Sequence, residues 1–366
     1  MKFSCLKVNL ERALGAAERF TGKNVTLPVL ANVLMEIDGS SLVVRATNLE
    51  HAVEIRVPGD ARALGMVSVP ARVVSSLVQA TREDKVHLEA KQGNLIVASQ
   101  SRQSRVNGVN AEEFPLIPKV KNTVSFLAPA GVLAHALSRV LPAVSSSDFK
   151  PELGGVFLQA DQKNLICAAT DTFRLAEETL PLVKGPSGKA EAIVPQRVCQ
   201  EMTRILPEYG EEEVKLSFGE NQMTVEAGSA RITSRLIEGV FPDYRAIIPS
   251  QFARSVFLPK EEFLASIRSS SIFSSKLQDV ALAFSRGSME IASVNTEVGE
   301  YRTTMEAEYT GADGTVSFNY RYLMDGIQAL EEDELFLGCG EAASPALLRN
   351  KSHASFLYVV MPIRLT

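Results

Sequence analysis

Apolar residues recur along this chain at helical spacing, in segments that repeat at a long, nearly constant interval. The segments open at Val69, Val194 and Phe318, so their first residues lie 125 and 124 positions apart. Each has apolar residues four and five positions on, and more of them one and two turns later. Residues at these steps form one face of an amphipathic helix. The pattern predicts three strand ends, each followed by a helix with one buried face.

A second set of segments alternates with the first and predicts three more helices. Each closes a short apolar strand on phenylalanine and has leucine seven residues later, at Phe3 and Leu10, Phe126 and Leu133, and Phe257 and Leu264. Alternating apolar and polar runs follow the helices, as from Val86 to Val97 and from Val214 to Val225. Such runs, with turn residues between them, predict antiparallel hairpins. The repeating unit is a strand, a helix and about three strands, and it occurs six times.

The first two repeats end alike, which places the domain boundaries. Glu113–Pro115 closes the first repeat and Val240–Tyr244 closes the second. The boundaries then fall near residues 121 and 250 and give three domains of near-equal size, 1–121, 122–250 and 251–366. Each domain holds two helices on one face of an antiparallel sheet, whose other face can be solvated. The predicted fold class is α+β, with three repeated domains.

Composition indicates a folded protein outside the membrane. Apolar residues make up 45% and charged residues 22% of the chain, which is usual for a globular protein. No run approaches the ~18 uninterrupted apolar residues that span a bilayer, and residues 1–7 lack the apolar stretch of a secretory signal. The four cysteines are scattered and form no CxxC pair. We therefore expect reduced core thiols in a cytoplasmic protein.

The net charge of −5 argues mildly against a nucleic-acid binder, whose usual footprint is basic. That objection holds only if the charge is spread evenly. Arg72, Arg197 and Arg321 occupy the same position in the three repeats, in a helical first turn where the helix dipole favours acids. One explanation is that arginine keeps each helix soluble; the other is contact with phosphates. The threefold match favours phosphates.

Acidic residues gather at helix ends and hairpins, so the helical layer is relatively basic. The predicted DNA-contacting residues are Lys23, Arg72, Arg139, Arg197, Arg204 and Arg321. No zinc finger, aromatic-rich RNA-binding motif or long basic helix is visible in the sequence. A thin layer of arginines can neutralise phosphates but cannot read bases. Any DNA binding is therefore expected to be independent of base sequence.

The sequence offers no convergent reactive groups. Its four histidines are isolated and form no HxH or HExxH pattern. Gly185–Lys189 resembles a phosphate loop, but it is too short and lies between hairpin strands. Asp171, in an apolar setting, is expected to cap a turn or to pair with Arg174. We expect neither an enzyme nor a metal ion or other cofactor.

Short stretches in a fixed order, on top of the triple repeat, resemble the β subunit of bacterial DNA polymerase III, the sliding clamp. They are Thr26–Leu30, Val69–Arg72, Ala169–Asp171 with Arg174–Ala176, Phe241–Tyr244 and Tyr358–Leu365. The resemblance covers the whole chain. It implies a head-to-tail homodimer closed into a ring, with helices lining a hole for duplex DNA and sheets outside. It also implies no enzymatic activity.

The resemblance further implies a cleft between the middle and C-terminal domains that binds short linear motifs of the polymerase III α subunit, the clamp loader and repair proteins. Carried over position by position, the cleft residues are Leu153, Thr170, Thr172, Phe173, Arg174, Leu175, Pro242, Ile247, Asn319, Tyr322, Pro345, Val359, Val360, Met361, Pro362 and Ile363. Apolar residues around a few polar ones are what a peptide pocket needs. The chain departs from the family at Thr172 and Phe173, where Gly-His is usual, and at Ala246, where arginine is usual. These departures affect ligand preference.

The resemblance also implies a dimer seam. Ile272 and Phe273 would insert against an opposite edge at Val106 and Gly108, whose side chains are smaller than usual in the family. A peptide-binding scaffold without DNA is the main competing hypothesis. It explains the cleft but not the threefold arginine, and a nucleotide- or metal-dependent enzyme lacks its reactive groups. Retention on nicked circular DNA, lost after linearisation, would separate the ring from both.

Overall fold

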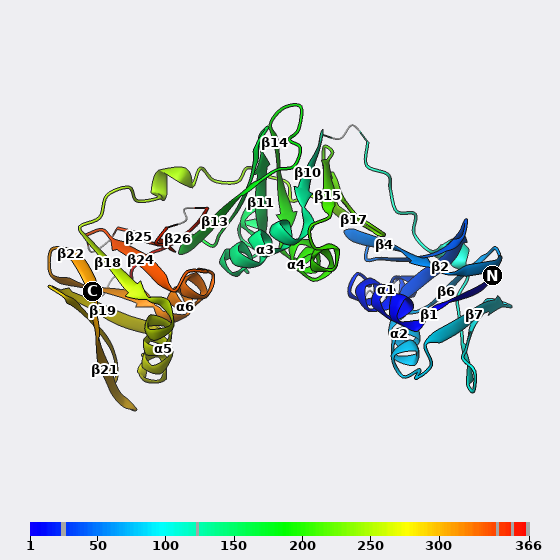
Figure 1. The fold of residues 1–366 in the computed structure, drawn as a ribbon, viewed down its shortest axis with the longest axis horizontal. Coiled ribbons are helices and arrows are strands. Elements are labelled where there is room, and N and C mark those ends of the chain that lie inside the picture. The colour runs from blue at the N-terminus through cyan, green and yellow to red at the C-terminus, as the bar shows by residue number, and fades with distance from the viewer. Residues whose placement is uncertain (23–26, 122–123, 342–343, 353–354, 364–366) are drawn as a thin grey trace.

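The computed structural model describes residues 1–22, 27–121, 124–341, 344–352 and 355–363. They form an open arc of three parts that follow one another along the chain, with the N-terminal and C-terminal domains at opposite ends (Figure 1). The helices lie along the concave side of the arc and the sheets make up its convex side. This is the layer of helices on antiparallel sheet that the repeat predicts. The exact domain boundaries at 121 and 250 stay a prediction.

The described residues contain six α-helices, one for each predicted unit. They are α1 (Lys7–Arg19), α2 (Ala71–Gln79), α3 (Ala130–Val140), α4 (Gln196–Ile205), α5 (Lys260–Ser270) and α6 (Tyr320–Gln328). In α1, Leu10, Ala13, Leu14 and Ala17 are buried to 1% exposure or less. Their spacing of three and four residues places them on one face. The predicted alternation of strands and helices is confirmed.

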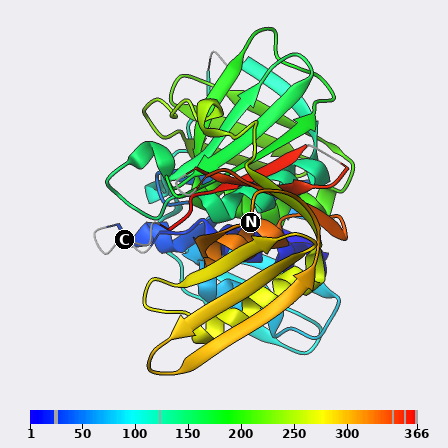
Figure 2. The same ribbon diagram turned by 90° about the vertical axis from the view of Figure 1, so that its left-hand side faces the viewer.

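In the described part of the chain, antiparallel strands form four sheets. The first belongs to the N-terminal domain and has the order β5 (Asp60–Ala63), β1 (Lys2–Leu6), β7 (Lys85–Lys91), β8 (Asn94–Ala98) and β9 (Gln103–Val106). The fourth belongs to the C-terminal domain and has the order β21 (Gly299–Glu306), β20 (Ser288–Asn295), β19 (Asp279–Ser285) and β23 (Gly314–Asn319). Figure 2 shows this sheet in the foreground, with α5 behind it.

The other two sheets each cross from one domain into the next. The second has the order β10 (Val124–Pro129), β15 (Glu213–Phe218), β16 (Gln222–Ala227), β17 (Ala230–Arg235), β4 (His51–Pro58), β3 (Ser41–Thr47), β2 (Asn32–Asp38) and β6 (Met66–Pro70). The third has the order β14 (Ala190–Pro195), β11 (Gly155–Ala160), β12 (Asn164–Thr170), β13 (Arg174–Pro181), β26 (Phe356–Val360), β25 (Ala346–Asn350), β24 (Glu334–Cys339), β18 (Arg254–Pro259) and β22 (Glu308–Gly311). Backbone hydrogen bonds therefore run continuously through both domain junctions.

The same kinds of strand meet at both junctions. In each case the third strand after the first helix of one domain pairs antiparallel with the last strand of the next domain: β4 with β17, and β13 with β26. Two equivalent strands have no such partner among the described residues. They are β21, the third strand after α5, and β9, the last strand of the N-terminal domain; both are edge strands at the far ends of the arc. Edge strands carry unpaired backbone groups, which makes them sites for pairing with another chain.

One equivalence predicted from the sequence, that of Phe257 with Phe3 and Phe126, is wrong. Phe3 and Phe126 are 1% exposed and pack beneath helices, but Phe257 points to the other face of its sheet. Val256, which is fully buried in the helical core, takes the place of Phe3 and Phe126. The error is a shift of one residue, which in a strand exchanges the two faces.

A second apolar cluster lies apart from the helical core, on the outer face of the third sheet. Its buried members are Leu153, Ala168, Leu175, Ile193, Phe241, Tyr244, Phe336, Leu347 and Val359. We call it the outer cluster. It contains residues of both the middle and the C-terminal domain, so it joins the two domains on the convex side.

Candidate functional site

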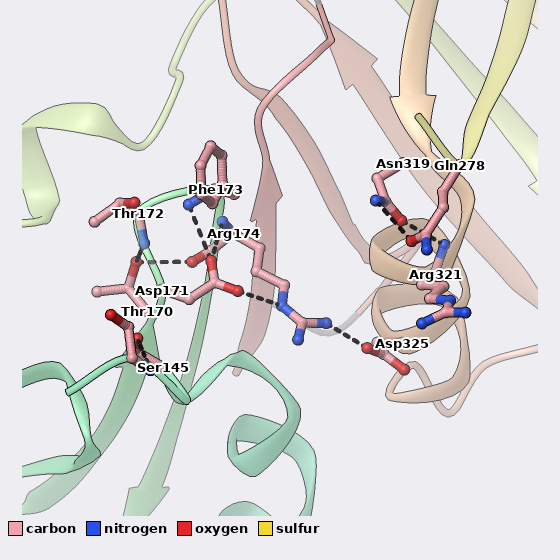
Figure 3. A network of polar contacts seen from close by, with 11 residues as sticks. Ser145, Thr170, Asp171, Thr172, Phe173, Arg174, Gln278, Asn319, Arg321 and Asp325 are labelled. Atoms are coloured by element: carbon pink, nitrogen blue, oxygen red, sulfur yellow. Dashed lines mark hydrogen bonds and ion pairs between the residues drawn. The ribbon is translucent and has the colours of Figure 1, made fainter. Parts of the chain in front are cut away.

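The turn between β12 and β13 is held by its own side chains. Thr170 Oγ1 donates to the carbonyl oxygen of Arg174 at 2.7 Å, and Asp171 Oδ1 accepts from the backbone nitrogens of Phe173 and Arg174 at 2.9 and 3.0 Å (Figure 3). Thr172 has a φ of 77°, which a β-branched residue adopts only where the surroundings impose it. The turn presents Phe173 to solvent, with 59% of the residue exposed.

Arg174 connects this turn to the C-terminal domain. Its Nε donates to Asp171 Oδ2 at 3.0 Å, its Nη1 binds Asp325 of α6, and its guanidinium lies 4.4 Å from the ring centre of Tyr322. Burial alone would lower the pKa of Arg174, but Tyr358, Asp325 and Asp171 outweigh it and raise that pKa. The expected pairing of Asp171 with Arg174, and its capping of the turn, are both confirmed. The guanidinium is a fixed structural link.

The pairing of β13 with β26 brings the predicted cleft residues of the two domains together. Leu175 lies opposite Val359, and the backbone nitrogen of Met361 donates to the carbonyl oxygen of Phe173 at 2.8 Å. The chain after β26 therefore runs beside the turn. Met361, Pro362 and Ile363 are all half-buried there.

The apolar floor between these strands is covered. Leu153, Leu175 and Val359 belong to the outer cluster and are 2%, 1% and 2% exposed. A segment that we call the strap, Phe241–Ile247, lies over the cluster and contributes two of its members. Pro242 of the strap is exposed, and its last residue is 48% exposed. Four predicted cleft residues, Leu153, Leu175, Val359 and Pro242, thus lie in one region, and the first three, which form the apolar floor, are covered.

The remaining predicted cleft residues lie at the start of α6 and at β25. Asn319 Oδ1 accepts from the backbone nitrogen of Arg321 at 2.9 Å, which caps α6, and its Nδ2 faces Gln278 Oε1 at 3.4 Å. Figure 3 shows Asn319 across from the Arg174 turn. Pro345 is half-buried immediately before β25, whose Ala346 pairs with Val360.

Three residues that the sequence reasoning did not assign also belong to this region. Asp325 binds Arg174, and Tyr244 of the strap donates its hydroxyl to Glu177 of β13. The repeat carried one usable signal, because Asp325 occupies in α6 the place that Glu201 occupies in α4, and both carboxylates bind arginine across a domain junction. Nothing in the local sequence pairs Tyr244 with Glu177.

The threefold arginines lie exposed in the first turns of α2, α4 and α6, on the concave side. Arg197 reaches across a junction, where its Nη2 donates to the carbonyl oxygen of Arg19 at 2.9 Å. Arg321 stays beside Tyr320, with its Nε 3.3 Å from the phenol oxygen. Arg204 is also exposed and binds Glu201. Lys23 lies outside the described residues.

Arg139 does not belong with the DNA-contacting residues. It is 5% exposed, its Nε donates to the carbonyl oxygen of Ala329 at 2.7 Å, and its Nη1 lies 2.8 Å from Glu178 Oε2. Its guanidinium also covers the ring of Phe356 at 4.1 Å. Burial lowers the pKa of Arg139, although Glu178 and Glu331 act to raise it. The prediction was wrong because this face of α3 packs against the C-terminal domain.

The two edges predicted to form the dimer seam differ in how far their side chains are exposed. Val106 is 6% exposed and packs in its own core, and a Cβ on Gly108 would lie 2.1 Å from the carbonyl oxygen of Gly93. The chain's own packing therefore uses both side-chain positions, and insertion of Ile272 and Phe273 against this edge of a second copy stays a prediction. Ile272 is 68% exposed, and Phe273 stacks on Tyr301 at 6.4 Å.

The four cysteines are free and buried, as expected from the sequence, and burial raises the pKa of Cys5, Cys199 and Cys339 to about 12. Within the described ranges, no group of three or more His, Cys, Asp or Glu side chains could hold a metal ion. In the same part of the chain, no helix is both long and apolar enough to cross a membrane.

Comparison with known proteins returns one family along the whole chain. Models of the N-terminal, central and C-terminal domains of the DNA polymerase III β subunit match residues 1–118, 128–243 and 245–364. The chain is 28% identical to the beta sliding clamp of Synechocystis sp. and 27% identical to that of Proteus mirabilis, over all of each chain. A crystal structure of the sliding clamp of Pseudomonas aeruginosa bound to griselimycin matches with a TM-score of 0.95 at 26% identity, covering 100% of both chains.

Proposed function

The chain belongs to the bacterial DNA polymerase III β subunits, the non-enzymatic sliding clamps, and we propose that two copies close into a ring around duplex DNA and hold partner proteins in the outer cleft. The observation that carries this proposal is the repetition of one junction. The two junctions within the chain use equivalent pairs of strands, and the third equivalent pair, β21 and β9, is left at the ends of the arc. Pairing them head to tail between two copies repeats the junction and closes a symmetric dimer.

Exposed apolar side chains at both ends of the arc support this closure. Val73 of α2 is 52% exposed, whereas Val198, at the same position in α4, is fully buried, and α4 lies at a junction, where its Glu201 binds Arg19. At the other end, Ile272, Val294 and Val298 are 68%, 51% and 62% exposed. Burying such surface against a partner contributes about 25 cal/mol per Å². A second copy supplies the missing partner for each end.

The helices on the concave side would face the DNA. Arg72, Arg197, Arg204 and Arg321 are exposed there and would neutralise phosphates without reading bases. Such contacts alone bind weakly, with a dissociation constant of about 10⁻⁴ to 10⁻⁶ M at physiological salt. Topological enclosure is therefore what would keep the protein on DNA.

Loading and retention on circular DNA test the ring. The solution mass should equal that of two chains, and protein loaded on nicked circular DNA should stay bound through a high-salt wash. Linearising the DNA should release it, because a ring slides off a free end. A monomeric mass, or equal loss from circular and linear DNA, would reduce the protein to a peptide-binding scaffold.

We further propose that the cleft around Leu175, Val359, Met361 and Pro242 takes apolar side chains of short peptide motifs in the polymerase III α subunit, the clamp loader and repair proteins. The pairing of β13 with β26 and the outer cluster support this, because they supply an apolar floor bordered by polar groups. Phe173 and Ala246 make the rim of this cleft less polar than the usual family residues would.

A further inference from the structure

The floor of the cleft is not open to a ligand as the protein stands. Leu153, Leu175 and Val359 of this floor are at most 2% exposed, whereas Met361 at its border is half-buried. The three floor residues share the outer cluster with Phe241 and Tyr244, which come from the strap. An anchoring side chain can reach the floor only if part of that cover moves.

The strap is attached to the sheet beneath it at three points. Phe241 stacks on Phe157, with ring centres 4.9 Å apart and planes 6° from parallel, and Tyr244 meets Phe241 edge-on at 5.9 Å. Arg245 Nη2 donates to Gln159 Oε1 at 2.8 Å. The third attachment is the hydrogen bond from the Tyr244 hydroxyl to Glu177 Oε2. Stacking tolerates sliding, whereas a hydrogen bond is directional.

Glu177 stands beside the floor itself. It lies two residues after Leu175 on β13, so both side chains point to the same face of the sheet. Tyr244 is 4% exposed. Burial, and then Glu177, raise the pKa of Tyr244, so its hydroxyl remains a donor. The bond therefore ties the strap to β13 two residues from Leu175, in the same apolar cluster that a peptide must reach.

Resting on the proposed peptide cleft, we propose that Tyr244 and Glu177 are positioning residues that latch the strap over the floor, and that peptide binding requires this latch to open. Motif entry is then limited by strap opening, and the strength of the latch sets the association rate. A fixed wall would instead act on the lifetime of the complex. The two roles differ in the rate constant that a weakened latch changes.

The test uses Tyr244→Phe, which keeps the ring and removes only the hydroxyl, in the full-length protein. The probe is a synthetic peptide of the polymerase III α subunit's C-terminal residues, measured by surface plasmon resonance. Since one hydrogen bond contributes about 0.5–1.5 kcal/mol, the association rate constant should rise about two- to tenfold. Hydrogen exchange at the Ile247 and Ile248 amides, which donate to carbonyl oxygens of the strap, should accelerate in the free protein.

Matched variants separate the latch from general loosening. Glu177→Gln keeps an acceptor and should behave nearly as the wild type, whereas Glu177→Ala should resemble Tyr244→Phe. Tyr309→Phe removes a comparable hydroxyl contact, to the carbonyl oxygen of Ala312 in the C-terminal domain, and should change neither rate. An unchanged association rate with faster dissociation would overturn the latch in favour of a fixed wall. No peptide binding by the wild type would instead remove the proposed cleft function and the latch with it.

Discussion

At the scale of single residues, the two domain junctions differ in the residue that opens the junction strand, β4 or β13, directly after the preceding turn. At the second junction it is Arg174, charged and paired with two carboxylates. At the first it is His51, which is 4% exposed, stacks edge-on against Phe20 at 5.3 Å, and has no hydrogen-bond partner at Nε2 among the described residues. Burial, and then Arg197, lower the pKa of His51 from 6.5 to about 4. The first junction therefore holds a neutral histidine where the second holds an ion pair.

This histidine should make stability depend on acid pH. The unfolded chain binds a proton on His51 below pH 6.5 and the folded chain only near pH 4, so its contribution is complete above 6.5 and is lost as pH falls towards 4. The loss is of order 2–3 kcal/mol. Denaturant unfolding of wild type and His51→Phe between pH 4 and 7.5 should show a shallower dependence in the variant. His87→Phe, at an exposed histidine, is the control. Parallel curves for all three proteins would contradict the assignment.

At the scale of elements, register identifies the residue of β9 that meets a partner. Val53 pairs with Ile232 across the first junction. Following paired residues from strand to strand gives two equivalent series, Phe3–Leu88–Val97–Ser104 and Phe126–Leu216–Val225–Ile232. Ser104 thus holds in β9 the place of Ile232 in β17.

A comparison of the turns before β4 and β21 identifies the residue of β21 that would meet a partner. Val53 pairs with Ala46, two residues before Asn48 of its turn. Tyr301 pairs with Ser293, which likewise stands two residues before a turn asparagine. Both asparagines accept from a backbone nitrogen of the turn. Tyr301 therefore takes the place of Val53, and in the dimer it should face Ser104 of the partner copy.

Antiparallel pairing in this register brings Glu300 opposite Arg105 of the partner copy. Directly opposed charges of unlike sign stabilise a strand pair by roughly 0.2–1 kcal/mol, and like charges destabilise it. Glu300→Arg or Arg105→Glu should each weaken the dimer by about fivefold or more, while the double exchange should restore much of it. Mass photometry across a dilution series would measure the dissociation constants of the dimers. Additive losses in the double variant would mean that these residues do not face each other.

At the scale of the molecule, the arc separates two surfaces with different tasks. The exposed arginines of α2, α4 and α6 lie on the concave side, while the cleft and strap lie on the outer face of the third sheet. Changes on one side should leave the other unaffected. The net charge of −5 is compatible with DNA contact because four exposed arginines, Arg72, Arg197, Arg204 and Arg321, lie on the helices of the concave side.

Replacing Arg72, Arg197 and Arg321 together with glutamine should flatten the salt dependence of DNA binding. Each lost phosphate contact removes roughly 0.9 from the slope of log affinity against log salt. Fluorescence anisotropy on a short duplex across a salt series measures this slope, with dimer mass and peptide affinity expected to stay unchanged. Arg56, Arg62 and Arg231, exposed on sheet strands, form the matched triple control. An identical slope in the helix variant would place these arginines away from the DNA.

Local patterns of the sequence determined the elements, because a buried helix face or strand face needs only the right spacing of apolar residues. The six helices, the hairpins and the threefold arginine position could be predicted in this way. The turn at Asp171 could be predicted as well, since its hydrogen bonds span only three residues. Resemblance to a family added the cleft residues, which no local pattern indicates.

The tertiary structure decided whether each charged residue of a helix is buried or exposed, because that depends on which element packs against it. Arg139 and Arg204 both lie in the last turn of a helix, yet one is buried under the next domain and the other is exposed. Only the pairing of β13 with β26 brings Leu175 beside Val359, and only the packing of the strap against β13 brings Tyr244 to Glu177. These contacts join residues far apart in sequence, and their energies arise from burial that no short segment contains.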